Sequence, residues 1–124
     1  MANPNIVNVA TIYGNTSSTS LSTTSATSIV NNAAASGTVL KINSIVVANV
    51  DGTSAADITI NVYSQDDLGG TAYALASTIA VPADASLIVV DKSTSFYLLE
   101  DQSIGAVAGT AGDLVVTASW EQIS

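Results

Sequence analysis

The chain has 124 residues, with two Lys or Arg against ten Asp or Glu, no His, no Cys and a formal net charge of -8. Without His or Cys it has no Ser-His-Asp triad, no Cys nucleophile and no zinc site of the usual kind. Two cationic side chains cannot neutralise a run of phosphates, so neither a nucleic acid nor an anionic membrane surface is an expected partner.

The length favours one domain, residues 1–124, with a single hydrophobic core. Hydrophobic residues make up 48% of the chain, but Ala, Ser and Thr fill 50 of the 124 positions. The apolar runs are short, such as residues 45–48, and fall well below the 18 or so residues that span a bilayer. Residues 1–4 lack the basic start of a secretion signal, so no targeting segment is expected.

Apolar and polar residues alternate with period two along most of the chain, as Ile58, Ile60 and Val62 illustrate. Such alternation, rich in β-branched residues, is typical of half-buried strands. Turn signals such as Asp51-Gly52 and Gly69-Gly70 separate the segments. The predicted strands are 5–13, 16–23, 26–31, 38–50, 56–64, 71–80, 86–91, 96–100 and 113–121, with 103–108 a candidate for a tenth.

This pattern predicts an all-β protein, an antiparallel β-sandwich of about eight to ten strands. The spacing alone does not decide between a jelly roll and an immunoglobulin-like order of strands. The pair of Cys residues that flanks a Trp in immunoglobulin domains is missing, which favours a jelly-roll-like sandwich. Trp120 is in register with Leu114, Val116 and Ala118, so it is predicted to be a core residue of the last strand.

The first segment of the chain, residues 1–12, is a candidate N-terminal arm or strand that contacts neighbouring subunits. Its apolar side chains Ile6, Val7 and Val9 are the contact candidates. Residues 15–28 carry one large apolar side chain, Leu21, among many hydroxyls. They are either a flexible loop or an edge strand whose hydroxyls face water or a partner.

The segment 38–50 is apolar on both faces. A strand of that kind is covered on both sides. Either a loop folds over the outer face, or a subunit contact covers it, which makes Ile45 and Val47 further contact candidates. The two faces carry Leu40, Ile42, Val46, Ala48 and Val50 on one side, and Ile45 and Val47 on the other.

Tyr63 and Tyr97 are predicted to point away from the apolar residues next to them in sequence. An exposed Tyr can anchor a protein interface or stack on a sugar, or its ring can simply lie over the sheet beside cross-strand neighbours. Both residues therefore complete the set of contact candidates. A glycan-binding alternative would use Tyr13, Tyr63, Tyr73 and Asp66.

The acidic residues do not predict a metal or catalytic site. Asp51 and Asp57 flank one turn and Asp66-Asp67 opens another, but neither has EF-hand spacing, and turn Asp residues normally cap their own backbone. Glu100-Asp101 could supply one partner of a glycosidase pair, yet the chain has few aromatic residues to hold a sugar. No cofactor, metal or catalytic residue is therefore expected.

The low charge is itself informative. Only 10% of the residues are charged, against roughly 25% in an average domain. A surface of Ser, Thr and Ala loses little rotamer entropy on docking and has few charges to desolvate. With few charges to guard its strand edges, the chain is expected to form a homo-oligomer.

Several segments resemble the small virion structural proteins of tailed phages, particularly those of marine cyanobacteria. The segments are 1–9 (MANPNIVNV), 56–63 (ADITINVY), 81–87 (VPADASL), 97–104 (YLLEDQSI) and 119–124 (SWEQIS). They cover strands and turns and include no catalytic residues. The resemblance implies a component of the phage particle, made in the host cytoplasm and located in the virion.

We therefore expect a non-enzymatic structural protein, in the first place a decoration, or cement, protein that binds the assembled capsid. Its partners would be the major capsid protein or other virion proteins. The alternatives are a neck, tail or fibre protein, or a β-sandwich module that binds a glycan or another component of the host surface.

Overall fold

The computed structural model describes residues 4–124, which form nine strands and one short 3-10 turn. From β2 onward each strand begins and ends within two residues of its predicted range. The strands are β1 (Ile12–Ser20), β2 (Thr27–Asn32), β3 (Val39–Asn49), β4 (Ala56–Tyr63), β5 (Ala72–Val81), β6 (Ser86–Val90), β7 (Phe96–Leu98), β8 (Gln102–Ala108) and β9 (Leu114–Ile123), and the turn η1 (Lys92–Thr94) separates β6 from β7.

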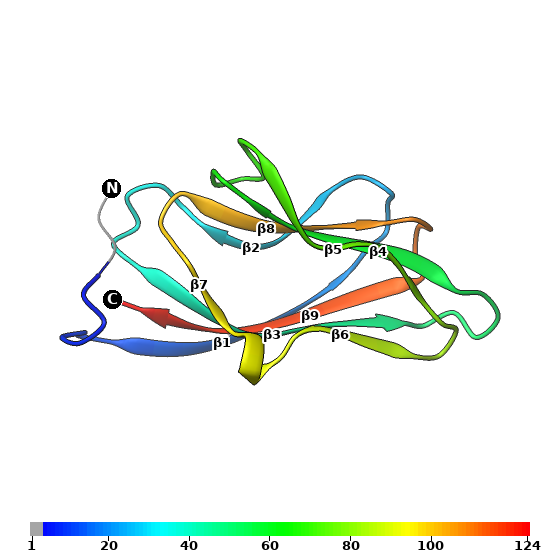
Figure 1. Ribbon diagram of the computed structural model, residues 1–124, viewed down its shortest axis with the longest axis horizontal. Helices are drawn as coiled ribbons and strands as arrows, with labels where there is room; N and C mark the ends of the chain where they lie inside the picture. The colour runs from blue at the N-terminus through cyan, green and yellow to red at the C-terminus, as the bar shows by residue number, and fades with distance from the viewer. Residues whose placement is uncertain (1–3) are drawn as a thin grey trace.

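The strands form two antiparallel sheets that pack against each other (Figure 1). Sheet A has the order β1-β9-β3-β6, with β7 also pairing with β3, and sheet B has the order β2-β8-β4-β5. The pairs β4–β5, β3–β6/β7, β2–β8 and β1–β9 are nested like one long hairpin. A long hairpin folded over itself into two sheets is a jelly roll. The predicted antiparallel sandwich is confirmed, and this strand order selects the jelly roll over the immunoglobulin arrangement.

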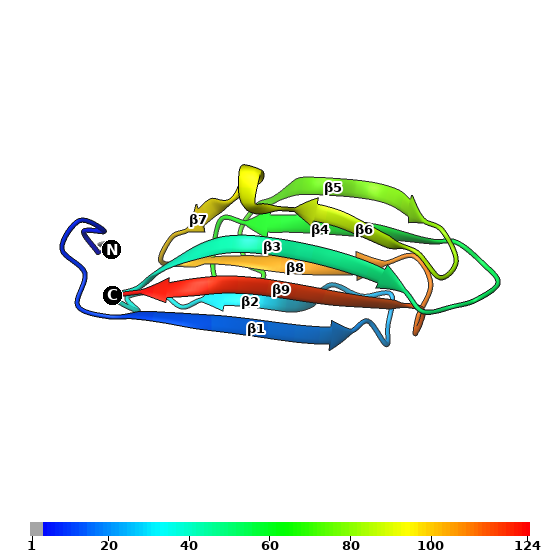
Figure 2. The same cartoon turned by 90° about the horizontal axis from the view of Figure 1, so that it is seen from below.

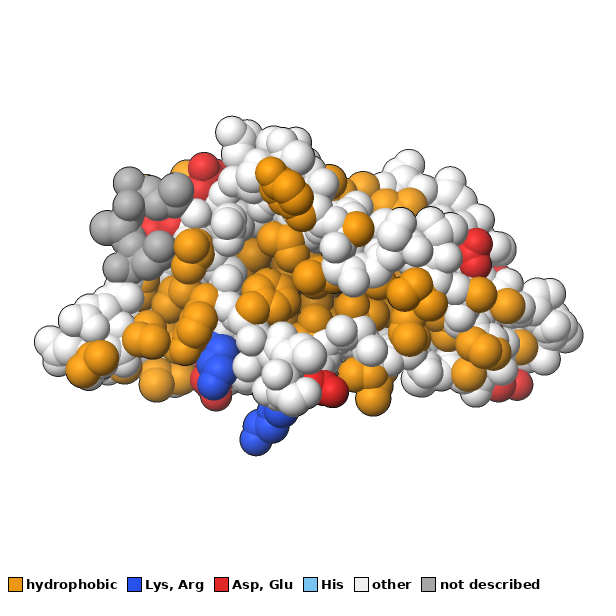
Figure 3. All heavy atoms as spheres, viewed as in Figure 1, with side chains coloured by type: hydrophobic (Ala, Val, Ile, Leu, Met, Phe, Trp, Pro, Cys, Tyr) orange, Lys and Arg blue, Asp and Glu red, His pale blue; other side chains and the backbone are white. Residues whose placement is uncertain are grey.

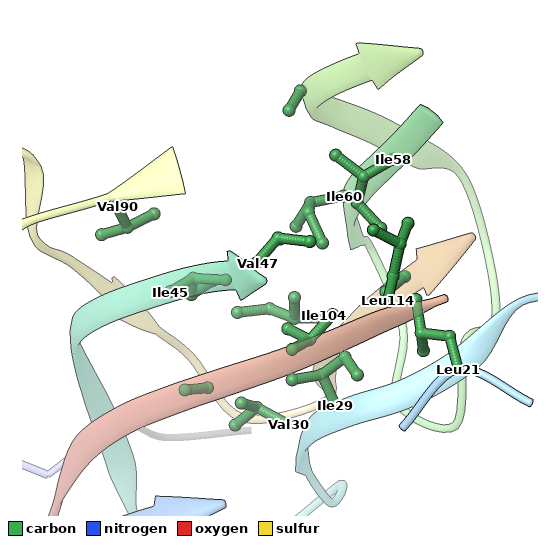
Figure 4. Close-up of a cluster of buried hydrophobic side chains, with 14 of the residues drawn as sticks. Leu21, Ile29, Val30, Ile45, Val47, Ile58, Ile60, Val90, Ile104 and Leu114 are labelled. Carbon is green, nitrogen blue, oxygen red and sulfur yellow. The ribbon is translucent and has the colours of Figure 1, made fainter. Parts of the chain in front are cut away.

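The core lies between the two sheets and is built mainly from β-branched side chains and Leu (Figure 4). β-branched residues suit this position because their stiff side chains pack well on a pleated surface. Leu114, Val116 and Ala118 on β9 are fully buried, as their alternation predicted. Trp120 continues that row but is only partly buried, and it packs against the margin of the core.

A β-bulge in β3 explains why the segment 38–50 looks apolar on both faces. Ile42 is opposite Trp120 and Ser44 is opposite Ser119, so Asn43 is an extra residue on β3. Such a bulge shifts the alternation by one position. Leu40 and Ile42 point inward before the bulge, and Ile45, Val47 and Asn49 point inward after it. The prediction of two apolar faces along the whole segment is therefore wrong: from Leu40 onward β3 buries one face, and Val39 at its start is buried on the other.

The predicted strand 5–13 is wrong over most of its length, because regular pairing begins only at Ile12. The Asn5 side chain accepts a hydrogen bond from the backbone N–H of Val7 (3.0 Å), and the Asn5 carbonyl accepts one from Asn8 (3.1 Å). An Asn that caps its own backbone in this way favours a turn over a strand. Downstream, residues 12–20 form an edge strand, and Leu21 immediately after it is fully buried.

A buried asparagine ties the two sheets together at the end where β2 and β7 meet. The Asn32 side-chain amide donates to the carbonyl oxygens of Thr38 and Leu98, each at 3.1 Å. Its own oxygen accepts from the hydroxyls of Ser36 (2.6 Å) and Thr38 (3.2 Å). Because every polar atom of this side chain has a partner, Asn32 can be buried without the penalty of an unpaired amide.

Candidate subunit interface

Among the described residues, the candidate site is an area of the outer surface and not an enclosed pocket or metal site. No group of three or more carboxylates among residues 4–124 is placed to hold a metal ion. Within the same range no pocket is found. In the part of the chain that is described, none of the helical structure is long and apolar enough to cross a membrane.

The seven predicted contact residues divide into two groups. Ile45 and Val47 are fully buried and Tyr63 is 8% exposed, so these three have almost no surface to offer a neighbour. The bulge at Asn43 turns Ile45 and Val47 into the core, which corrects their predicted outward direction. The other four remain at the surface: Ile6 (49% exposed), Val7 (91%), Tyr97 (42%) and the half-buried Val9.

Tyr63 lies on the outer face of sheet B, as the alternation predicted. It is nevertheless buried. It is opposite Ser103, and its neighbour Asn61 is opposite Gly105, so its ring lies over β8. A Cβ atom added to Gly105 would come within 2.9 Å of Tyr63 Cε2 and 2.7 Å of Leu68 Cδ2. The loop between β4 and β5, residues 64–71, therefore covers this face; we call it the flap.

The flap is held on sheet B by backbone-to-side-chain hydrogen bonds. Ser103 Oγ accepts from the Leu68 N–H (2.9 Å) and donates to the Gln65 carbonyl oxygen (2.8 Å). Asn31 Oδ1 on β2 accepts from the Asp67 N–H at 2.8 Å. Asp67 and Leu68 both have positive φ, 52° and 62°, as the two central residues of a type I′ turn require. A loop over an outer face is one of the two explanations offered for segment 38–50, and the face that this loop covers is that of sheet B.

The small residues on β8 are the feature of the sequence from which a covering loop at this face could have been predicted. Ser103 and Gly105 alternate with the buried Ile104 and Ala106, so the outer side of β8 is almost bare. A bare stripe lets another backbone approach closely. Ser103 is fully buried, which an outward Ser reaches only beneath a covering segment.

The tyrosines of the glycan-binding alternative are not brought together. Tyr13 (58% exposed) is on β1, at one edge of sheet A. Tyr73 (63% exposed) is on β5, which packs beside β6 at the opposite edge. Tyr63 is beneath the flap, and Asp66 Oδ2 within the flap accepts a hydrogen bond from the Ala34 N–H (3.1 Å). This dispersed set forms no sugar platform.

The exposed apolar side chains gather in two places. Figure 3 shows apolar side chains along the side where β5 faces β6 and β7. The second group surrounds the start of β1, at the end of the molecule where both termini lie (Figure 1). The large exposed apolar side chains are Tyr73, Leu75 and Ile79 on β5, Ile88 on β6, Tyr97 on β7, Leu99 after β7, Val50 after β3, and Ile6, Val7, Ile12 and Tyr13 at or before the start of β1.

Of the two Lys residues, Lys41 lies on sheet A and Lys92 lies in the turn between two of its strands. Lys41 is in the middle of the sheet, opposite Glu121 on β9 and Tyr97 on β7. Lys92 is in η1, whose first turn is capped by the Asp91 carboxylate. Hydrogen bonds to that carboxylate, above all from the Ser93 hydroxyl (2.6 Å), lower the pKa of Asp91 below its ordinary value of 3.8.

Comparison with known proteins finds solved structures of similar shape. One of them is a chain of the structure described as "Bacillus endospore appendages form a novel family of disulfide-linked pili", 19% identical, with a TM-score of 0.49. The match covers 92% of this chain and 88% of the other. No family model and no curated protein matches the chain. The present sequence has no Cys, so the disulfide linkage named there has no counterpart in it.

Proposed function

We propose that the chain is a non-enzymatic structural subunit that packs permanently against neighbouring subunits in a large assembly. The observation that carries this proposal is the surface: apolar side chains such as Val7 (91% exposed) and Ile88 (62% exposed) stand among Ser, Thr and Ala. Because only 10% of the residues are charged, docking of such a surface removes few charged groups from water, and its small side chains lose little rotamer entropy.

The assembly that we favour is the particle of a tailed phage, in which the chain would be a decoration protein on the capsid. The resemblance of segments 1–9, 56–63, 81–87, 97–104 and 119–124 to virion proteins supports this choice. The partners would be the major capsid protein and further copies of the chain, with a trimer as the favoured cluster. A protein that binds only the assembled shell stabilises it by mass action, and many copies add their effects.

The N-terminal segment is the part of the predicted contact surface that we retain in this proposal. Residues 1–12 would act as an arm that carries Ile6, Val7 and Val9 to a neighbour. Residues 1–3 lie outside the described part of the chain. Tyr97 would add a second contact on the outer side of β7, where it is 42% exposed.

Cryo-electron microscopy of the intact particle would test the location, and static light scattering of the purified chain would test assembly. Hundreds of copies on the shell are expected for a decoration protein. A copy number between about six and a few dozen would instead place it in the neck, tail or a fibre. A strictly monomeric protein that binds no particle would contradict the proposed function.

A further inference from the structure

Each sheet has two edge strands, and three of these four edges carry a feature that limits pairing with another chain. β5 contains two register shifts against β4, and Thr78 in β5 has a φ of +50°. β2 has six residues with a register shift of its own, and the flap bonds to its Asn31. The edge formed by β6 and β7 is interrupted by η1, which carries Lys92. Bulges, short strands, covering loops and lysines all disfavour the addition of a strand.

The fourth edge, β1, has none of these features. Its nine residues, Ile12–Ser20, pair with β9 without a register shift. The sequence of β1 is IYGNTSSTS, with no charge and no Pro. Figure 2 shows β1 as the outermost strand of sheet A, and the N-terminal segment curves away from its free side. β1 is thus a long, flat and uncharged edge, the type that most readily pairs with another strand.

The direction of the free backbone groups on β1 follows from the hydrogen bonds at its two ends. Thr11 and Ser124 exchange both backbone bonds (2.9 and 3.0 Å), and the Leu21 N–H donates to the Leu114 carbonyl (2.9 Å). Residues in antiparallel strands alternate between bonded and non-bonded pairs. The odd-numbered residues of β1 therefore bond to β9, and the even-numbered residues point their N–H and C=O groups to the free side. These residues are Ile12, Gly14, Thr16, Ser18 and Ser20.

We propose that β1 pairs antiparallel with β1 of a second copy, about a two-fold axis at Thr16, to join the two A sheets into one continuous sheet. This inference rests on the proposed assembly role and names a strand that joins two copies as a pair, a contact separate from the one that would build the favoured trimer. In this register all five even-numbered residues meet even-numbered residues: Thr16 meets Thr16, Gly14 meets Ser18 and Ile12 meets Ser20. Each such pair exchanges two backbone hydrogen bonds, up to about ten across the interface.

Two properties of β1 suit it to a second copy. The pairing is isologous, so the same nine residues satisfy both sides of the interface. The chain carries a net charge of -8, which makes two copies repel each other, but β1 brings no charge of its own to the contact. The even-numbered side chains are exposed on the outer face and, apart from Ile12, small. They leave room for strands 4.7–4.9 Å apart, the usual sheet spacing.

Single cysteines test the register, because the chain has no Cys of its own. In the proposed pairing the two Cα atoms of residue 16 are about 5.5 Å apart, inside the 4.4–6.8 Å range of disulfides. Under mild oxidation Thr16→Cys should give a disulfide-linked dimer in clear excess over the control variant. Ser18→Cys is the matched control: its two copies are displaced by about 13 Å along the strands and should remain monomeric. Cross-linking of both variants alike, or of neither, would overturn the proposal.

A second measurement does not depend on oxidation. Thr16→Pro removes an N–H that points to the free side and leaves every bond to β9 in place. Sedimentation equilibrium should show at least a tenfold weaker dimer for Thr16→Pro than for Thr16→Val, which keeps the N–H, with matching circular dichroism spectra. Equal dimer affinity of the two variants would overturn the proposal. If copies still assemble although Thr16→Cys does not cross-link, the β1 pairing fails while the proposed structural role stands.

Discussion

The side-chain amide of Asn49 on β3 donates a hydrogen bond to the carbonyl oxygen of Val81 on β5, 3.0 Å away, and so joins sheet A to sheet B. The same amide donates to the Ser54 carbonyl (2.9 Å), and Asn49 Oδ1 accepts from the Asp51 N–H (2.9 Å). Asn49 is 3% exposed and Val81 is fully buried. A single residue thus ties the two sheets at the end of the sandwich where β3 leads into β4.

Replacement of Asn49 by Ala should lower the free energy of unfolding by about 1–3 kcal/mol, because the buried Val81 carbonyl loses its partner. Urea denaturation followed by Trp120 fluorescence measures this change. Asn8→Ala is the control, since Asn8 is exposed and should change stability by less than about 0.5 kcal/mol. Equal stability of the two variants would show that the tie between the sheets is energetically neutral.

The bulge at Asn43 keeps the two halves of β3 pointing into the same core. Deletion of Asn43 would move either Leu40 and Ile42 or Ile45 and Val47 to the outer face, because a one-residue slip reverses every side chain. We expect this deletion to abolish cooperative thermal unfolding, as measured by circular dichroism. Deletion of Thr24, in the exposed loop between β1 and β2, should leave a cooperative transition. A cooperative transition in the Asn43 deletion would contradict this role of the bulge.

The strands from β2 to β9 could be predicted from the sequence because period-two alternation is a local signal, and the antiparallel sandwich followed from them. Three features depended on information that alternation does not carry. The bulge at Asn43 follows from pairing with β9, and the turn at Asn5 follows from a side chain that bonds its own backbone. The burial of Tyr63 follows from the flap, whose position depends on Ser103 and Gly105 nearly 40 residues later. Ile45, Val47 and Tyr63 were predicted to contact a neighbour, but they are buried within the subunit for these non-local reasons.

Gly105 allows the flap to lie close to β8. Gly105→Ala would place a Cβ atom 2.7 Å from Leu68 Cδ2 and 2.9 Å from Tyr63 Cε2, so the flap would have to move. We expect a loss of about 1–3 kcal/mol in stability. Faster hydrogen exchange of the Leu68 N–H, which bonds to Ser103 Oγ, should accompany this loss. Gly14→Ala is the matched control, since nothing lies within 4 Å of a Cβ atom there. Unchanged exchange at Leu68 would contradict the cover that we assign to the flap.

The cap of η1 should be sensitive to acid. The pKa of Asp91 is lowered in the folded chain, chiefly by the Ser93 hydroxyl, so its stabilising effect is present above the ordinary value of 3.8. That effect is lost as the pH falls through the lowered folded pKa. Carbon-13 NMR titration should give a pKa below 3.8 for Asp91 and a rise toward 3.8 in Ser93→Ala. Ser95→Ala should leave it unchanged, and an equal rise in both variants would exclude the Ser93 bond as the cause.

Val7 in the N-terminal arm should contribute to assembly without contributing to the fold. Val7 is 91% exposed, so Val7→Ser removes no core contact and should change stability by less than about 0.5 kcal/mol. If Val7 is buried against a neighbour in the assembly, the same substitution should weaken particle binding or self-association about tenfold, since a buried Val contributes about 1.5 kcal/mol or more. Val50→Ser, at a position 60% exposed and outside the arm, is the control. Light scattering and a particle co-sedimentation assay measure both variants. Equal assembly of Val7→Ser and Val50→Ser would remove the arm from the contact surface.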